Sequence, residues 1–219
     1  MPNNRDPEGQ DFQSLVFLVE NLRESQVRAV VDSRINEFRR LGEGSSRDLF
    51  KEMSFCILTA NYSAEKSMRM QSAIGEGFIT LTEEALANRL REMGHRYPEA
   101  RASYIVQARG HADSLKDELA SLPSPADARK WLADSIKGLG YKESSHFLRN
   151  IGYLDLAILD FHILDVLERH RCITKPKALT RKRYVEVESV LRELSERIGL
   201  ALGELDLYLW YSETGKVLK

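Results

Sequence analysis

Apolar residues recur at intervals of three and four along most of this chain, and no other feature limits its possible folds so strongly. Two N-terminal segments show the pattern: Phe12, Leu15, Val16, Val19 and Leu22, then Val27, Val30, Val31, Ile35 and Phe38. This spacing places apolar side chains on one stripe of a helix. No stretch shows sustained alternation of β-branched residues, which a half-buried strand would require. We therefore predict an all-α fold.

Short signals mark where several helices begin and end. The segment Leu41–Gly44, with two glycines, predicts the end of the second helix. Ser45 with Asp48 predicts a capping box for the next helix, and Ser124 before Pro125 predicts another helix start, because serine caps helices and proline suits their first position. An irregularity is expected near Gly110, inside a long helical stretch from Glu99.

Length and composition indicate a globular protein with one domain or two closely packed lobes. The chain has 219 residues, of which 42% are apolar, enough for a substantial core. Residues 1–10, MPNNRDPEGQ, are predicted to be a flexible tail, followed by a helical domain over residues 11–219. The opening lacks the pattern of a signal peptide, and no apolar run approaches a membrane span. We expect no association with membranes.

Charge and cysteine content exclude several classes of protein. Thirty-two basic residues nearly balance thirty-three acidic ones, so any binding of a polyanion must be local. Cys56 and Cys172 are too few for a disulfide framework, a four-cysteine zinc site or an iron–sulfur cluster, and they suggest a reducing cytoplasm. The five histidines show no metal-ligand spacing, so we expect neither a metal nor another cofactor.

One segment carries a strong local positive charge. Between Arg169 and Arg183 lie seven basic residues and no acidic one: Arg169, Arg171, Lys175, Lys177, Arg181, Lys182 and Arg183. A solvated connection between helices and a strip facing phosphates explain this basic strip about equally well.

The most informative motif is a two-glycine turn between two predicted helices, within a helix-hairpin-helix element at about residues 125–150. Gly138 and Gly140 allow a sharp turn, and Leu139 between them anchors it in the core. Backbone N–H groups at such a turn, together with the positive end of the next helix, favour a phosphate oxygen. Alone the motif is weak evidence, because glycine also simply ends helices.

The segment from Lys137 to Asp165, KGLGYKESSHFLRNIGYLDLAILDFHILD, resembles the helix-hairpin-helix and following aspartate of base-excision repair DNA glycosylases. The resemblance implies that Lys142 is the nucleophile and that Asp160, eighteen residues later, is the partner carboxylate. No proline follows Asn150-Ile151-Gly152-Tyr153, unlike most of that superfamily. In this departure the chain resembles the archaeal-type 8-oxoguanine DNA glycosylases. It also resembles them in residues 57–64, residues 94–97 and the terminal Lys219.

The resemblance implies a two-lobed glycosylase fold with a DNA cleft between the lobes and a C-terminal helical segment that closes a base pocket. The implied partner is double-stranded DNA containing oxidised guanine, bound through its backbone at Gly138, Leu139 and Gly140. Tyr97 and Trp210 would stack on the extruded base, and Lys219 would offer it a donor and an acceptor. A hydrophobic staple for Tyr97 and a core position for Trp210 remain open, and His162 could equally orient the site or be a buried core histidine.

Chemistry supports the same pair of residues. A lysine amine with a solution pKa of about 10.4 is protonated, and both a helix N-terminus and partial burial would lower that pKa. The free amine could attack a deoxyribose and form a Schiff base, which leads to β-elimination. Asp160 precedes an apolar helical run, so it could cap that helix and also act as the catalytic carboxylate.

These features predict a DNA glycosylase with lyase activity, acting as a monomer in the cytoplasm at the nucleoid. The main alternative is a non-catalytic helix-hairpin-helix module that only binds the DNA backbone. Such a module needs the two glycines but not Lys142 coupled to Asp160. A helical interaction protein that binds no nucleic acid is a second alternative, which salt-sensitive DNA binding would exclude.

Overall fold

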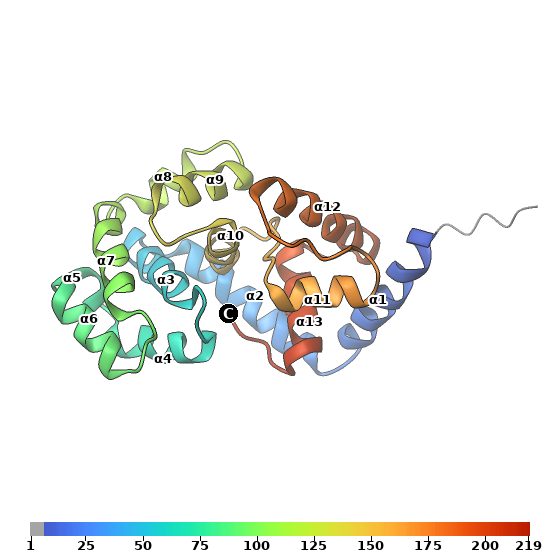
Figure 1. The fold of residues 1–219 in the computed structure, drawn as a ribbon, viewed down its shortest axis with the longest axis horizontal. Coiled ribbons are helices and arrows are strands. Elements are labelled where there is room, and N and C mark those ends of the chain that lie inside the picture. Colours follow the sequence, from blue (N-terminus) through green and yellow to red (C-terminus); the bar gives the residue numbers. More distant parts are fainter. Residues whose placement is uncertain (1–6) are drawn as a thin grey trace, which may run out of the picture. The chain divides into compact units, whose positions relative to one another are not determined.

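Helices supply all the secondary structure of residues 7–219, the part of the chain that the computed structural model describes (Figure 1). Side chains are described from Phe12 onward. Residues 1–6 of the predicted tail lie outside the described residues. Residues 7–10, the rest of that range, belong to α1 (Pro7–Arg23), so the first helix begins earlier than the sequence predicted. No helix among the described residues is long and apolar enough to cross a membrane.

The chain divides into two compact units, and α2 (Val27–Glu43) contributes residues to both. The first unit extends to Asn36 and resumes over Leu154–Val217. It contains α1, α11 (Phe161–Arg169), α12 (Arg181–Ile198) and α13 (Leu202–Thr214). Helix α1 packs against α12 and α13, and α11 packs against α13. The apolar stripe predicted for α1 is confirmed, because Leu15 and Val19 are fully buried.

The second unit comprises Glu37–Tyr153 with Leu218–Lys219. Its helices are α3 (Ser46–Thr59), α4 (Ala64–Ile74), α5 (Gly77–Thr80), α6 (Glu83–Glu92), α7 (Pro98–Ala108), α8 (Leu115–Ala120), α9 (Pro125–Ser135) and α10 (Tyr141–Asn150), with a short 3₁₀ helix over Arg109–His111. Helix α3 is central, because it packs against α4, α5, α7, α8 and α10. Such a helix must be buried on nearly all sides, and every residue of α3 from Glu52 to Thr59 is buried.

Several helix ends follow the predicted signals. Ser45 and Asp48 form the capping box of α3, and hydrogen bonds from Ser45 hold the pKa of Asp48 down at about 2. Ser124 caps α9, whose first residue is Pro125. The irregularity near Gly110 is the 3₁₀ helix that separates α7 from α8.

The helix break predicted at Leu41–Gly44 is only partly correct, because α2 continues through Gly42 to Glu43. Gly42 serves a packing purpose instead. A Cβ atom at this position would lie 2.2 Å from the carbonyl oxygen of Ile151, just after α10. Only a glycine allows the backbone at residue 42 to approach Ile151 so closely.

We predict that Gly42→Ala destabilises the second unit by about 1–3 kcal/mol or more, because a backbone carbonyl cannot move aside as a flexible side chain would. Gly110→Ala is the matched control, since a Cβ there meets nothing within 4 Å. It should stay within about 1 kcal/mol of the wild type. Urea denaturation followed by circular dichroism measures both, and equal stabilities of the two variants would contradict the close-contact explanation.

Candidate active site

The turn between α9 and α10 has the sharp geometry that its two glycines predicted. Gly138 has a φ of +96°, and a Cβ there would lie 2.6 Å from a ring carbon of Tyr104, so both backbone and space require glycine. Leu139 is 4% exposed and its N–H donates to the carbonyl oxygen of Ile136 at 3.2 Å. The predicted anchoring of the turn by Leu139 is confirmed.

Helix α10 begins with a carboxylate that the sequence analysis did not single out. The N–H of Gly140 donates to Glu143 Oε2 at 3.3 Å, which is the second half of a capping box. The N–H groups of Leu139 and Gly140 are therefore both engaged within the turn. A phosphate that binds at Gly140 must share this N–H with Glu143 or displace it. The spacing of Gly140 and Glu143 was the sequence signal for this contact.

Lys142 occupies the second position of α10, beside the positive end of the helix. Its side chain is 29% exposed, and its Nζ lies 3.2 Å from Glu143 Oε1. Glu143 thus contacts both the hairpin backbone and the predicted nucleophile. This contact orients the Lys142 side chain.

The rest of α10 is buried, and His146 stands one turn after Lys142. Its ring packs edge-on against Phe55 of α3. Burial lowers the pKa of His146 well below its usual value, and the charges of Arg149 and Lys142 lower it further, whereas a hydrogen bond to the backbone of Lys219 opposes them. His146 is therefore neutral near pH 7.

Lys219 is docked in the second unit by its side chain. Its Nζ lies 2.8 Å from Glu52 Oε2 and 2.5 Å from Gln71 Oε1, and 4.5 Å above the ring of Phe55. Glu52 is only 2% exposed. Lys142 and Lys219, two residues predicted from the sequence, therefore both influence the same buried histidine, Lys142 through its charge and Lys219 through its charge and a backbone hydrogen bond.

Tyr97 lies at the N-terminal end of α7, in the second unit. Its side chain is half-exposed, and its ring lies 5.1 Å from the Arg96 guanidinium and 5.7 Å from that of Arg101. A partly exposed aromatic ring with two cations nearby suits contact with a nucleic acid. Packing alone does not explain this exposure.

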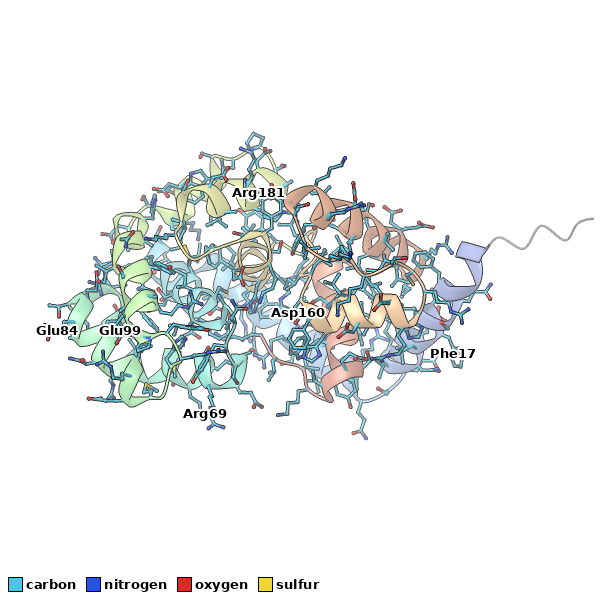
Figure 2. All side chains as sticks on the ribbon, viewed as in Figure 1. Phe17, Arg69, Glu84, Glu99, Asp160 and Arg181 are labelled. Carbon is cyan, nitrogen blue, oxygen red and sulfur yellow. The ribbon has the colours of Figure 1, made fainter. Side chains whose placement is uncertain are left out.

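Asp160 begins α11 in the first unit (Figure 2). Its Oδ1 accepts a hydrogen bond from the N–H of Ile163 at 2.9 Å, so the predicted helix cap is confirmed. A carboxylate in this position is held by the helix N-terminus, because an otherwise unpaired N–H group donates to it.

Two aromatic side chains follow Asp160 in the sequence, at the start of α11. His162 contacts Trp210 of α13 edge-on at 4.7 Å between ring centroids. Phe161, which the sequence analysis did not single out, lies 3.9 Å from the His162 ring and is 62% exposed. Trp210 is only partly buried, and its Nε1 is buried without a hydrogen-bond partner among the described residues. A purely structural tryptophan would normally satisfy that donor.

The basic strip is not uniform. Arg169, Lys175 and Arg183 pair with Glu213, Asp165 and Glu186 respectively. In contrast, Lys177 and Lys182 are exposed and form no ion pair with the side chains described, those of residues 12–219. Residues of the strip also line a hollow of about 710 Å³ at the start of α12. The free charge of the strip is thus much smaller than the sequence suggests. No group of three or more metal-ligating side chains occurs in the described part of the chain.

The family model described as 8-oxoguanine DNA glycosylase matches residues 31–200. The chain belongs to the 8-oxoguanine DNA glycosylase family. This glycosylase is 52% identical to the 8-oxoguanine DNA glycosylase/AP lyase of Korarchaeum cryptofilum, over 94% of this chain and 98% of the relative. It is 48% identical to the protein of the same name from Methanocaldococcus jannaschii, again over 94% of this chain and 99% of the relative.

Solved structures agree with this assignment. The crystal structure of the M. jannaschii 8-oxoguanine glycosylase/lyase in complex with a 15mer DNA containing 8-oxoguanine has a TM-score of 0.92 and 47% identity, and the match covers 94% of this glycosylase and all of that chain. The 8-oxoguanine DNA glycosylase of Thermotoga maritima has a TM-score of 0.89 and 48% identity, with 95% and 100% covered. The predicted all-α helix-hairpin-helix glycosylase fold is confirmed.

Proposed function

We propose that this glycosylase removes 8-oxoguanine from double-stranded DNA and then cleaves the DNA strand as an AP lyase, with Lys142 as the nucleophile. The observation that carries the role of Lys142 is its position: it lies directly after the two-glycine turn, partly buried at the start of α10 and oriented by Glu143. Relatives that match nearly the whole chain carry the name 8-oxoguanine DNA glycosylase/AP lyase, which supports the activity.

The proposed reaction proceeds through a covalent intermediate. The lone pair of the Lys142 amine forms a bond to C1′ of the deoxyribose while the bond from C1′ to the base breaks, and the base leaves with that electron pair and takes up a proton. Loss of a proton from the bound amine and opening of the sugar give a Schiff base. Removal of a C2′ proton then expels the 3′ phosphate. This chemistry requires no metal or other cofactor.

Asp160 supplies negative charge in this scheme. Its carboxylate stabilises the positive charge that develops on the sugar, and it accepts a proton from Lys142. The helix cap keeps this carboxylate in place without further adjustment during the reaction, because the Ile163 N–H already holds Oδ1.

Three further residues recognise the base. Tyr97 and Trp210 offer aromatic surfaces to an extruded base, and Lys219 is the third residue. The DNA backbone is contacted separately, by Gly138, Leu139 and Gly140. Lys219 distinguishes 8-oxoguanine from guanine, because the damaged base has an N7–H donor where guanine has an acceptor. We also propose that the protein acts as a monomer in the cytoplasm, at the nucleoid.

We predict that Lys142→Gln reduces strand cleavage on the order of a thousandfold or more and removes the adduct that borohydride traps on an 8-oxoguanine duplex. DNA binding should stay close to that of the wild type, because the turn contacts phosphate through its backbone. Lys137→Gln, in the same turn, is the matched control and should still form the adduct. An adduct with Lys142→Gln would disprove the assignment, and no adduct with the wild type would favour a non-catalytic binding module.

We predict that Asp160→Asn folds normally, because asparagine also caps helices, but releases 8-oxoguanine about a hundredfold more slowly or worse. Single-turnover base release measures this rate. Asp155→Asn is the control, since Asp155 pairs with Arg192 on the surface of the same unit. Unchanged base release by Asp160→Asn would remove this residue from the mechanism and direct attention to Asp165.

We predict that only the unpaired lysines of the basic strip contribute to DNA binding. Neutralising Lys177 and Lys182 together should lower the slope of log affinity against log salt by about 1–2, because each phosphate contact contributes about 0.9. Neutralising Lys175, which pairs with Asp165, should change the slope less. Identical slopes for the wild type and the double variant would mean that the strip is only a solvated connection.

A further inference from the structure

Glu52 is a buried carboxylate at the centre of a hydrogen-bond network in the second unit. Its Oε1 accepts from Asn150 Nδ2 at 2.7 Å, and its Oε2 accepts from Gln71 Nε2 at 2.9 Å and from Lys219 Nζ at 2.8 Å. Side chains from three helices therefore meet in this network: Glu52 from α3, Gln71 from α4 and Asn150 from α10.

The ammonium of Lys219 is almost fully occupied by this network. An ammonium has three N–H donors, and it meets Glu52 Oε2, Gln71 Oε1 and the face of the Phe55 ring. In addition, an ammonium cannot accept a hydrogen bond, so it cannot bind the N7–H that marks 8-oxoguanine. The side chain of Lys219 is thus an anchor, and the part of the residue left for a base is its backbone oxygen, which has a second lone pair beside the one that accepts from His146.

The partners of the Lys219 ammonium offset the cost of holding it in one place. Ordering a lysine side chain costs up to about 2 kcal/mol of conformational entropy, and burying its charge costs more unless a partner compensates. The charge of Glu52 and the second contact from Gln71 offset both costs. The hydrogen bond between His146 and the Lys219 backbone holds the main chain of the same residue.

We infer that Glu52 and Gln71 are positioning residues that set the selectivity for the damaged base, because they hold Lys219 in the one place where its backbone oxygen meets the N7–H. The inference rests on the proposed role of Lys219 in base recognition. It assigns a function to two side chains in α3 and α4 that take no part in the covalent chemistry.

The test compares three single-turnover rates: base release from an 8-oxoguanine duplex, base release from a guanine duplex, and cleavage of an abasic duplex, which has no base to recognise. Glu52→Gln keeps the volume and removes the charge. We expect it to lower the ratio of 8-oxoguanine to guanine release by about tenfold, and to slow abasic cleavage far less. Lys219→Met should lower the same ratio to a similar extent, and the double variant should be no worse than either single one, because the two side chains act as a unit.

Two further variants keep the test decisive. Gln71→Met leaves the Glu52–Lys219 pair in place and removes the hydrogen bonds of Gln71 to Lys219, Glu52 and the Lys51 backbone, so it should lower the ratio by about threefold even if Glu52→Gln fails to fold. Glu76→Gln is the matched control, because Glu76 forms a similar ion pair with Lys51 in the same unit at 2.7 Å, but is 63% exposed. It should leave all three rates unchanged.

The outcomes separate the inference from the proposal on which it rests. If Lys219→Met lowers the ratio but folded Glu52→Gln and Gln71→Met do not, the positioning role is wrong and base recognition by Lys219 stands. If Lys219→Met leaves the ratio unchanged, the side chain is not the anchor and the positioning role is wrong. Deletion of Lys219, which also removes its backbone oxygen, then tests base recognition separately, and an unchanged ratio for the deletion would mean that base recognition by Lys219 is wrong. If abasic cleavage falls as much as 8-oxoguanine release, the network only stabilises the fold.

Discussion

The packing of α3 against α10 is the constraint on which the candidate site of the second unit depends. Helix α10 carries Lys142 at its start and buries everything from Ser144 to its end, much of it against α3. Because α3 is itself buried on nearly all sides by five other helices, it cannot shift to accommodate a change in α10. The position of Lys142 is therefore set by a rigid interior, although its amine remains accessible.

This interface is unusual because it contains charge. Glu52, Arg149 and Asn150 are all buried between apolar neighbours, and hydrogen bonds link them in series from Arg149 through Asn150 to Glu52. Unpaired, each group would cost several kcal/mol, so the hydrogen bonds within the network offset the cost of burying its polar and charged groups. Lys219, from the far end of the sequence, adds a further partner to Glu52, so it contacts the same interior that positions Lys142.

Much of the fold and part of the site could be predicted from local pattern. Ser45, Ser124 and Asp160 cap helices as expected, because a cap depends only on residues three positions apart. The turn at Gly138 follows from glycine chemistry in the same way. The prediction failed at Gly42, where a glycine that would ordinarily end a helix instead allows close contact with residue 151, more than a hundred positions away.

The sequence by itself determined the all-α class and the two-glycine turn, since each depends on short-range spacing, and its resemblance to a known family predicted the pair Lys142 and Asp160. Only the tertiary structure decided which charges are free. It paired Arg169, Lys175 and Arg183 of the basic strip with carboxylates, set Glu143 beside Lys142, and buried Glu52 against Lys219 across 167 residues. A charge acts through its neighbours in space, and a linear sequence does not record which residues those are.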